Sequence, residues 1–221
     1  MRLDNLFYNN NYVLMKKLFL LFFLSLIILL GIKNIHSYLS LSNPVHAEIL
    51  LVEGWIGDTY APKILEDFYR NHYSRIVIIG TRKPKMNGNI TNDTQSNAVI
   101  LRKKLRSLSN NTIIITLINS IYVNKHQTFN YLVSFKNWLM REIPDIESVN
   151  LFSVSLHARK SYLILRRVLP SSIEVGVISA TPIHYDAQYW WLSKRGIWLV
   201  FKNTISFINA YIFENCQYLA C

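Results

Sequence analysis

The chain has 221 residues, of which 51% are hydrophobic and 17% charged, and its formal net charge is +11. This length is enough for one domain with a proper core and short for two. The low charged fraction excludes an intrinsically disordered protein and indicates a membrane contribution. The positive charge is spread along the chain, because residues 1–46 hold only four of the 24 Lys and Arg residues.

The N-terminal part of the chain contains an apolar run over residues 18–32, with Lys16 and Lys17 before it and Lys33 after it. With its flanks this run reaches the roughly 20 residues that a transmembrane helix needs. It predicts a signal anchor, and a cleaved signal peptide is the alternative. The excess of lysine before the run places the N-terminus in the cytoplasm and the following domain outside the membrane.

The predicted organisation of the whole chain follows from this anchor. We expect an N-terminal cytoplasmic extension, one transmembrane helix, a short tether and an α/β domain, over residues 1–17, 18–38, 39–46 and 47–221. The chain would cross the membrane once, with the lipid bilayer as a partner.

Short apolar runs alternate with amphipathic segments through the domain. The runs predict strands over residues 47–52, 75–79, 112–118, 149–154 and 173–179. The segments between and after them predict helices over residues 61–69, 97–108, 128–142, 156–169, 186–194 and 199–215. This alternation predicts an α/β fold with a five-stranded, mostly parallel sheet, in which ligands bind beyond the carboxyl ends of the strands.

The residues that follow the predicted strands are therefore the candidates for a site. Glu53 follows the first strand and could act as a general base or hold a cation, or stabilise a turn or a helix end instead. Gly54 beside it lets the backbone turn sharply or approach a ligand. Asp58 is predicted to cap the next helix. Other residues in comparable positions are Trp55, Gly80, Thr81 and His184.

The sequence SLHARK after the fourth predicted strand is the most informative stretch. Ser155 is predicted to cap a helix whose first turn carries His157, Arg159 and Lys160. Cations oppose the helix dipole at this end, and a bound phosphate or carboxylate would explain them, whereas a solvated basic turn is the alternative. Thr128 opens another helix, where it could cap the helix or present its hydroxyl to the same cleft.

Several kinds of site are absent from the sequence. The chain has no glycine-rich dinucleotide motif, P-loop or nucleophile elbow. Its two cysteines, Cys216 and Cys221, show no metal-ligand spacing, so we predict no metal site, and they could pair or remain thiols. Which cofactor the protein uses, if any, stays open. The predicted export and the lack of aromatic residues among the basic ones argue against a nucleic-acid partner.

Several short segments together resemble the ElyC/SanA/YdcF family, which is built on a domain of unknown function. The segments are LVEGWIGD, RIVIIGT, KNWL, SLHARKS, VGVISA and HYDAQYWW, and they are spread over most of the predicted domain. The resemblance implies a Rossmann-like three-layer α/β/α fold and frequent membrane anchoring. It also implies a role in bacterial cell-envelope biogenesis, involving peptidoglycan or glycans linked to a polyprenyl phosphate.

The first functional hypothesis is an envelope enzyme that acts on a phosphate-bearing precursor at the inner membrane. It predicts that Glu53, Thr128 and His157 converge, with His157 as acid or base and Glu53 as base or metal ligand. The residues expected to bind the anion are Ser155, Arg159, Lys160, Gly80 and Thr81. The other pocket candidates are Gly54, Trp55 and His184.

The second hypothesis is an anchored, non-catalytic binding or assembly module that uses the same pocket. Two departures from the family pattern favour it. The family's His-x-x-Arg pattern falls on His157 and Lys160, and His126 and Gln127 stand where related sequences place Asp-Arg. Lysine keeps the charge but lacks the forked geometry with which arginine grips a phosphate.

Overall fold

The structure is a computed structural model that describes residues 3–82, 96–121 and 123–218, with the side chains of these ranges except at 3–14, 28–29, 82 and 213–218. Five strands form one parallel sheet in the order β3-β2-β1-β4-β5. The strands are β1 (Ile49–Glu53), β2 (Arg75–Arg82), β3 (Ile114–Ile121), β4 (Ser148–Val154) and β5 (Glu174–Ala180). All five predicted strands are present, and the predicted α/β class is confirmed.

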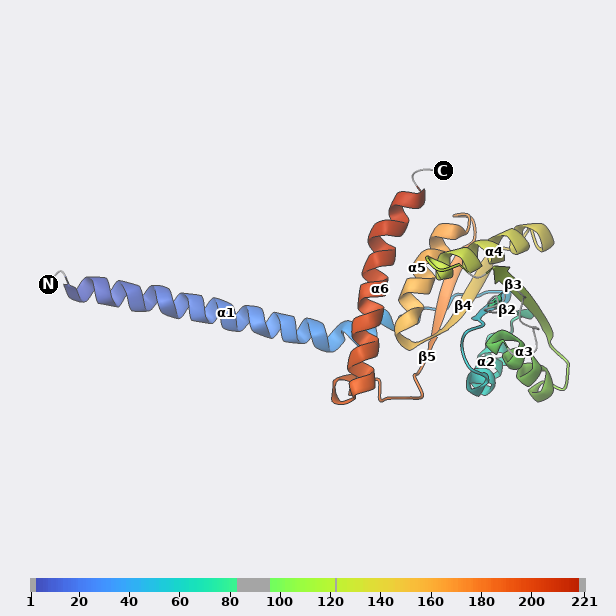
Figure 1. The fold of residues 1–221 in the computed structure, drawn as a ribbon, viewed down its shortest axis with the longest axis horizontal. Helices are drawn as coiled ribbons and strands as arrows, with labels where there is room; N and C mark the ends of the chain where they lie inside the picture. Colours follow the sequence, from blue (N-terminus) through green and yellow to red (C-terminus); the bar gives the residue numbers. More distant parts are fainter. Residues whose placement is uncertain (1–2, 83–95, 122, 219–221) are drawn as a thin grey trace.

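Helices cover both faces of the sheet (Figure 1). They are α2 (Ala61–Arg70) and α3 (Asn97–Leu108) on one face, and α4 (Gln127–Glu142) and α5 (Ala158–Val168) on the other. Alternate residues of β1 serve the two layers, because Leu50 and Val52 pack toward α2 and α3 whereas Ile49 and Leu51 pack toward α4 and α5. A strand that is covered on both sides is apolar throughout, which explains the continuous runs in the sequence.

Helix α1 (Leu3–Leu39) projects from the domain as a single long helix (Figure 1). Residues 3–17, predicted as an extension, continue this helix. Its part from Met15 to Leu39 is long and apolar enough to cross a membrane. The prediction of a membrane-type N-terminal helix, either an anchor or a signal sequence, is therefore confirmed.

The predicted tether is bound to the sheet rather than free in solvent. Asn43 and Val177 exchange backbone hydrogen bonds of 2.8 and 3.1 Å, which adds an antiparallel bridge to the edge strand β5. The buried Asn150 side chain accepts from the Val45 amide at 3.0 Å and donates to the Val45 carbonyl at 2.6 Å. The backbone of this segment is thus bonded both to the edge strand β5 and to Asn150 of β4.

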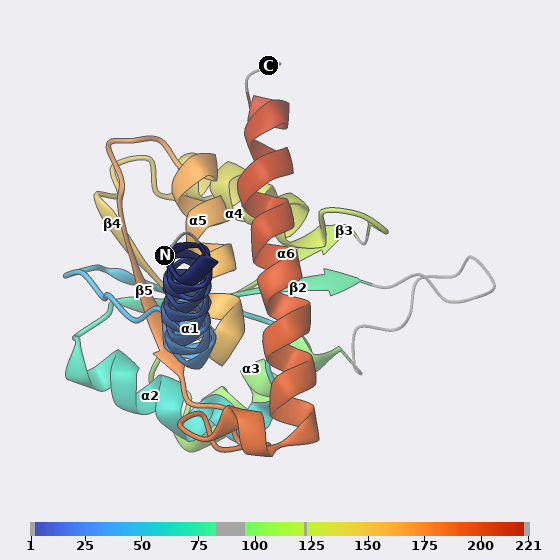
Figure 2. The same ribbon diagram turned by 90° about the vertical axis from the view of Figure 1, so that its left-hand side faces the viewer.

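The chain after β5 differs from the prediction in one place. Residues 186–194 were expected to form a helix, but they contain only the 3-10 helix η4 (Trp190–Leu192) before Lys194 opens the next helix. The Asp186 carboxylate accepts from the Gln188 amide at 2.7 Å, and this local turn competes with a helix. Helix α6 (Lys194–Tyr218) follows and packs on α5 and on the end of α1 (Figure 2).

Two further predictions concern helix starts and the cysteines. Asp58 does not cap α2; it opens the 3-10 helix η1 (Asp58–Tyr60), and the residue before α2 makes no side-chain cap. The possible pairing of Cys216 with Cys221 lies outside the described residues.

Candidate functional site

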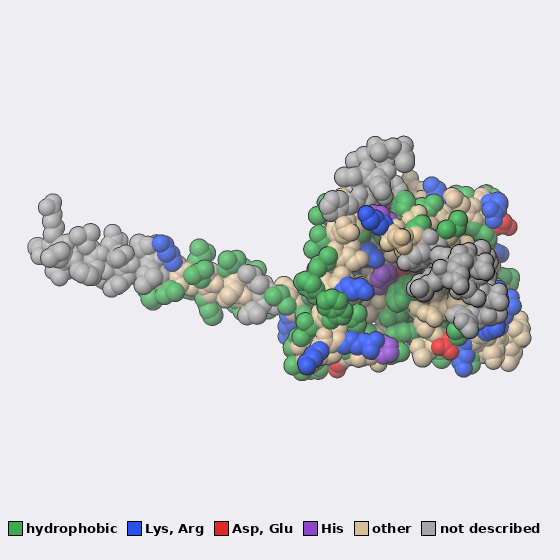
Figure 3. Space-filling model, in the orientation of Figure 1, with side chains coloured by type: hydrophobic (Ala, Val, Ile, Leu, Met, Phe, Trp, Pro, Cys, Tyr) green, Lys and Arg blue, Asp and Glu red, His purple; other side chains and the backbone are tan. Residues whose placement is uncertain are grey.

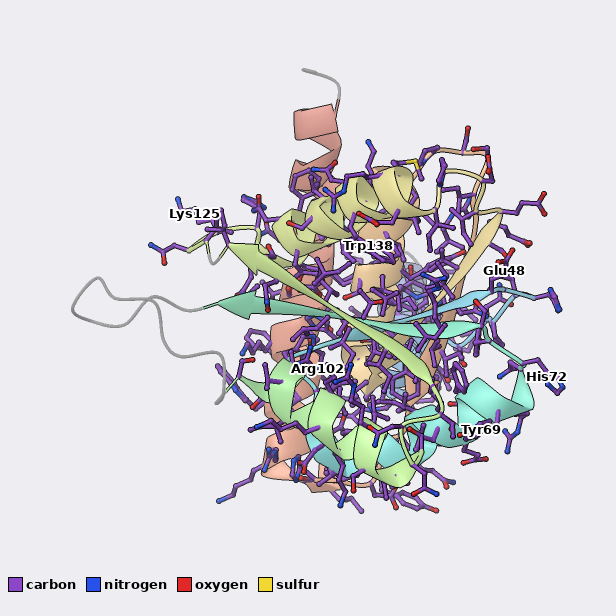
Figure 4. The ribbon with its side chains drawn as sticks, turned by 90° about the vertical axis from the view of Figure 1, so that its right-hand side faces the viewer. Glu48, Tyr69, His72, Arg102, Lys125 and Trp138 are labelled. Carbon is purple, nitrogen blue, oxygen red and sulfur yellow. The ribbon has the colours of Figure 1, made fainter. Side chains whose placement is uncertain are left out.

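A cavity of about 1510 Å³ opens at the carboxyl ends of the strands, where a parallel sheet is expected to bind ligands. The N-terminal turns of α3, α4 and α5 and the inner face of α6 form its walls. Figure 3 shows this face hollowed beside α6, with histidine and basic side chains around the hollow. Figure 4 locates the same edge by Lys125, which follows β3, whereas Glu48 and His72 lie at the opposite edge.

The structure brings together most of the residues predicted for the site. The predicted residues that line the cavity are Gly54, Trp55, Gly80, Thr81, Thr128, Ser155, His157, Lys160 and His184. Glu53 and Arg159 are not among the lining residues. Glu53 lies beneath the cavity wall, and Arg159 points to α1.

Glu53 ends β1 and is fully buried. Its Oε1 accepts hydrogen bonds from the Tyr131 hydroxyl and, at 2.7 Å, from the Ser161 hydroxyl. Its Oε2 accepts from the Ser153 hydroxyl. Burial and the neighbouring Glu53 carboxylate raise the pKa of Tyr131 well above its ordinary value, so this hydroxyl stays protonated and donates. The carboxylate thus ties β1 to β4, α4 and α5, and its hydrogen-bonding capacity is directed into the protein.

His157 connects this buried network to the cavity. Its Nε2 lies 3.8 Å from Oε1 of Glu53, and its ring packs edge-on to Trp55 with 4.9 Å between centroids. Burial and, as a smaller effect, the Lys160 charge together lower the pKa of His157 to about 4, against the opposing effects of Glu53 and Asn203. The imidazole is therefore neutral near pH 7 and able to accept a proton.

The cavity is strongly cationic. Among the described lining residues there are no Asp or Glu side chains, and the Lys and Arg residues are Lys125, Lys160, Arg195 and Lys202. Three helix N-termini, those of α3, α4 and α5, add partial positive charge at the same edge. The Lys160 ammonium donates to the Ser206 hydroxyl of α6 at 3.1 Å, which holds it against the wall. Such a surface favours an anionic ligand such as a phosphate.

Ser155 lines the cavity but does not cap α5. The residue has a left-handed backbone, with φ of 49°, and the position before α5 is His157, which makes no side-chain cap. The Ser155 hydroxyl instead lies 3.2 Å from the Tyr185 hydroxyl and 3.3 Å from Nε2 of His36 in α1. One wall residue of the cavity is therefore in direct contact with the membrane-type helix.

Arg159 also serves the junction with α1. Its Nε donates to the Tyr38 carbonyl, and its guanidinium lies over the Tyr38 ring at 3.8 Å from the centroid. His157, at the position before α5, and Lys160 are three residues apart and lie on one side of the helix start, whereas Arg159 is rotated away from that side.

Thr128 is the second residue of α4, is buried, and does not cap the helix. Its hydroxyl interacts with that of Tyr131, and this lowers the Tyr131 pKa against the larger effect of burial. Beside it, the Gln127 amide donates to the Thr81 hydroxyl at 2.9 Å, which joins α4 to the end of β2.

Gly54 and Gly80 are required by packing. A Cβ at Gly54 would lie 2.6 Å from Cβ of Ala98 and 2.7 Å from the Ile79 carbonyl oxygen. A Cβ at Gly80 would also lie 2.6 Å from Cβ of Ala98. The start of α3 therefore packs closely against both glycines, which also border the cavity.

Sequence reasoning missed the hydroxyl donors around Glu53 and the cations of α6. Ser161 stands four residues after His157, a spacing that places both on one helical face. The spacing of the polar residues in the apolar C-terminal helix also indicated a shared helical face. Three of them, Lys202, Asn203 and Ser206, line the cavity.

Comparison of the chain with protein-family models and with curated proteins gave no match. Within the described parts of the chain, no group of three or more His, Cys, Asp or Glu residues could hold a metal ion.

Replacing His157 with glutamine is expected to flatten the pH dependence of stability between pH 6.5 and about 4. The folded-state pKa lies below the unfolded value, so the unfolded chain takes up the proton first as the pH falls. The stability that the neutral imidazole provides is complete above pH 6.5 and is lost, by about 3 kcal/mol, as the pH approaches 4. Thermal unfolding of the wild type and of His157→Gln at both ends of this pH range measures this loss of stability. Equal losses in the two proteins would contradict the assignment of the lowered pKa to His157.

Proposed function

We propose that the protein is a membrane-anchored factor of bacterial cell-envelope biogenesis that binds and acts on a phosphate-bearing precursor. The precursor would be a peptidoglycan intermediate or another glycan linked to a polyprenyl phosphate. The observation that carries the proposal is the cationic cavity without described acidic lining residues, in a domain joined to a helix of membrane-spanning length. The resemblance to the ElyC/SanA/YdcF family supports the envelope setting.

The cavity suits a phosphate ester in charge and in size. Lys160 and Lys202 approach from two different helices, and the N-termini of α3, α4 and α5 point to the same space. A volume of about 1510 Å³ leaves room for a sugar beside the phosphate.

His157 is the residue best placed for proton transfer. As a neutral imidazole it can take the proton of an attacking hydroxyl or water and return it to the leaving oxygen. Lys160 and Lys202 would offset the charge that builds on the phosphate oxygens. Glu53, saturated by its three hydroxyl donors, would hold the surrounding elements and His157 in place rather than take that proton itself.

The proposed location is the inner membrane, with a cytoplasmic N-terminus and an extracytoplasmic domain. The lysines before the apolar run support this orientation. The docking of α1 supports an anchor over a cleaved signal peptide, because Leu39 is fully buried and His36 reaches Ser155. Cleavage at residues 45–47 would separate these contacts from the domain.

A specific observation favours the second candidate, a binding or assembly module without catalysis. The carboxylate predicted as a base is fully buried and is hydrogen-bonded by three hydroxyls. Lysine at position 160 and His126-Gln127 before Thr128 also depart from the family pattern. In this case the cavity would recognise the precursor and α1 would keep it at the membrane.

The two candidates differ in turnover, which can be tested with the full chain in bilayer nanodiscs that contain undecaprenyl phosphate or undecaprenyl diphosphate. We expect saturable binding of both lipids, measured as a rise in melting temperature. If the protein is an enzyme, we expect mass spectrometry to detect conversion of the lipid to a product. The rate of this conversion is expected to fall by about 10²–10⁴-fold in His157→Gln. Binding without any product would select the binding module, and the absence of saturable binding would contradict both candidates.

A further inference from the structure

Helix α6 exposes a continuous apolar face. Six large apolar side chains on it each leave 48–61% of their surface exposed, namely Ile197, Trp198, Phe201, Ile205, Ile208 and Ile212. Their spacing of three and four residues places them on one side of the helix over several turns. The described parts of the chain do not cover this face.

The opposite side of the same helix lines the cavity. The residues that do so are Arg195, Leu199, Lys202, Asn203, Ser206, Asn209 and Ala210. At 100° per residue, the centre of this set lies about 130° around the helix from the centre of the apolar face. One side of α6 therefore belongs to the site, and the other needs a different partner.

We infer that the apolar face of α6 rests in the surface of the bilayer that α1 crosses. Helix α6 runs across the direction of α1, on the side of the domain from which α1 emerges (Figures 1 and 2). Hydrophobic side chains gather along this edge of the domain in Figure 3. If α1 crosses the membrane, α6 lies along the membrane plane.

The position of α6 along the axis of α1 fits a helix that lies at the membrane interface. The two helices meet where Phe207 packs edge-on to Tyr38, with 5.8 Å between ring centroids. Tyr38 stands five residues after Lys33, the residue that follows the apolar run. The contact between the two helices therefore lies about 7.5 Å beyond Lys33 along the axis of α1. In-plane amphipathic helices bury their apolar face about 5–10 Å into the boundary between head groups and acyl chains.

The charges of this region select a bilayer over a protein partner. Residues 190–212 contain no Asp or Glu, and their Lys and Arg residues are Lys194 at the start of α6 and Arg195 and Lys202, which line the cavity. Lys33 of α1 lies over the Trp191 ring, 5.9 Å from its centroid. Tryptophan together with basic residues is typical of the membrane interface and attracts anionic head groups.

This placement goes beyond the proposed function and rests only on its anchoring part, because it holds whether the cavity catalyses or only binds. It sets the cavity directly beside the head groups, with α6 as the wall between the cavity and the bilayer surface.

Tryptophan fluorescence of the full chain tests the placement. All five tryptophans lie in the domain, at positions 55, 138, 190, 191 and 198, so α1 does not contribute to the signal. The chain is reconstituted in vesicles of phosphatidylethanolamine and phosphatidylglycerol that carry acyl-brominated lipid. The difference between the wild type and Trp198→Phe isolates the emission of Trp198. We expect brominated lipid to remove most of this emission and aqueous acrylamide to remove little of it.

A pair of charge insertions provides a matched control. Phe201→Glu places a carboxylate on the apolar face, and Ile100→Glu places one at an exposed position of α3. We expect the first to relieve the quenching of Trp198 by brominated lipid and the second to leave it unchanged, with circular dichroism confirming the fold of each.

Two results would overturn the inference. Quenching of Trp198 by acrylamide but not by brominated lipid would place the face in water. Quenching by neither would show that protein covers it, for example a second copy of this chain. Trp198→Phe replaces an exposed ring by a smaller one, so this measurement does not depend on a disruptive variant.

Discussion

Replacing Glu53 with alanine is expected to lower the free energy of unfolding by about 3–5 kcal/mol, since each buried hydroxyl that loses its acceptor costs about 1–3 kcal/mol. The carboxylate is fully buried and accepts hydrogen bonds from Tyr131, Ser153 and Ser161. Its removal leaves three hydroxyl groups without their acceptor and opens a cavity at the point where β1 meets α4 and α5. Unfolding of the full chain by urea, followed by tryptophan emission, measures the loss in the domain alone.

Matched variants separate this role from a general effect of charge. Glu48→Ala removes an exposed carboxylate just before the same strand, and we expect it to change stability by less than about 0.5 kcal/mol. Glu53→Gln keeps the shape and one carbonyl acceptor, so its cost is expected to lie between those of the two alanine variants. If Glu53→Ala were as stable as the wild type, the hydroxyl network would not be a structural element of this fold.

This outcome bears on how the two functional candidates are judged. A carboxylate that stabilises the fold makes loss of activity in Glu53→Ala ambiguous, because an unfolded domain is also inactive. His157 is the better probe of chemistry, since it lines the cavity and contacts Glu53 without being part of its hydrogen bonds.

Most of the sheet could be predicted because its strands are buried on both faces and read as continuous apolar runs. The predicted helix over residues 97–108 coincides with α3, whose Leu101 and Leu105 point into the core. The docking of residues 39–46 could not be predicted, because the backbone of Asn43 and Val45 bonds to β5 and to the Asn150 side chain of β4. Such pairing depends on tertiary position and leaves no periodic pattern.

The site was predictable to the extent that it follows from topology. Residues after parallel strands converge at one edge, and this rule alone brought Gly54, Thr81 and His157 to the same cavity. The rule does not say whether a side chain turns toward the cavity or into the core, which is why Glu53 lies beneath the wall. It also says nothing about a later helix, so the cations that α6 adds were missed.

Neutralising the cavity cations is expected to have the largest effect on binding. Lys160→Gln and Lys202→Gln should each weaken the binding of undecaprenyl phosphate in nanodiscs by about 10–100-fold, because a hydrogen bond to a charged group contributes about 1.5–3 kcal/mol. Both side chains line the cavity, and Lys160 is held in place by Ser206. Titration of the lipid against the melting temperature of the full chain gives the affinity.

Arg159→Gln is the control for these variants, because it removes the same charge from the residue next to Lys160. Its guanidinium lies over the Tyr38 ring of α1, so we expect the affinity for the lipid to stay within about threefold of the wild type. An equal loss in Arg159→Gln and Lys160→Gln would mean that net charge, and not the cavity, attracts the phosphate. Lys160→Gln has a second readout that net charge does not mimic: since Lys160 lowers the pKa of His157, its removal should raise that pKa above about 4. The imidazole titration, followed by NMR, would then move toward neutral pH in Lys160→Gln and stay in place in Arg159→Gln.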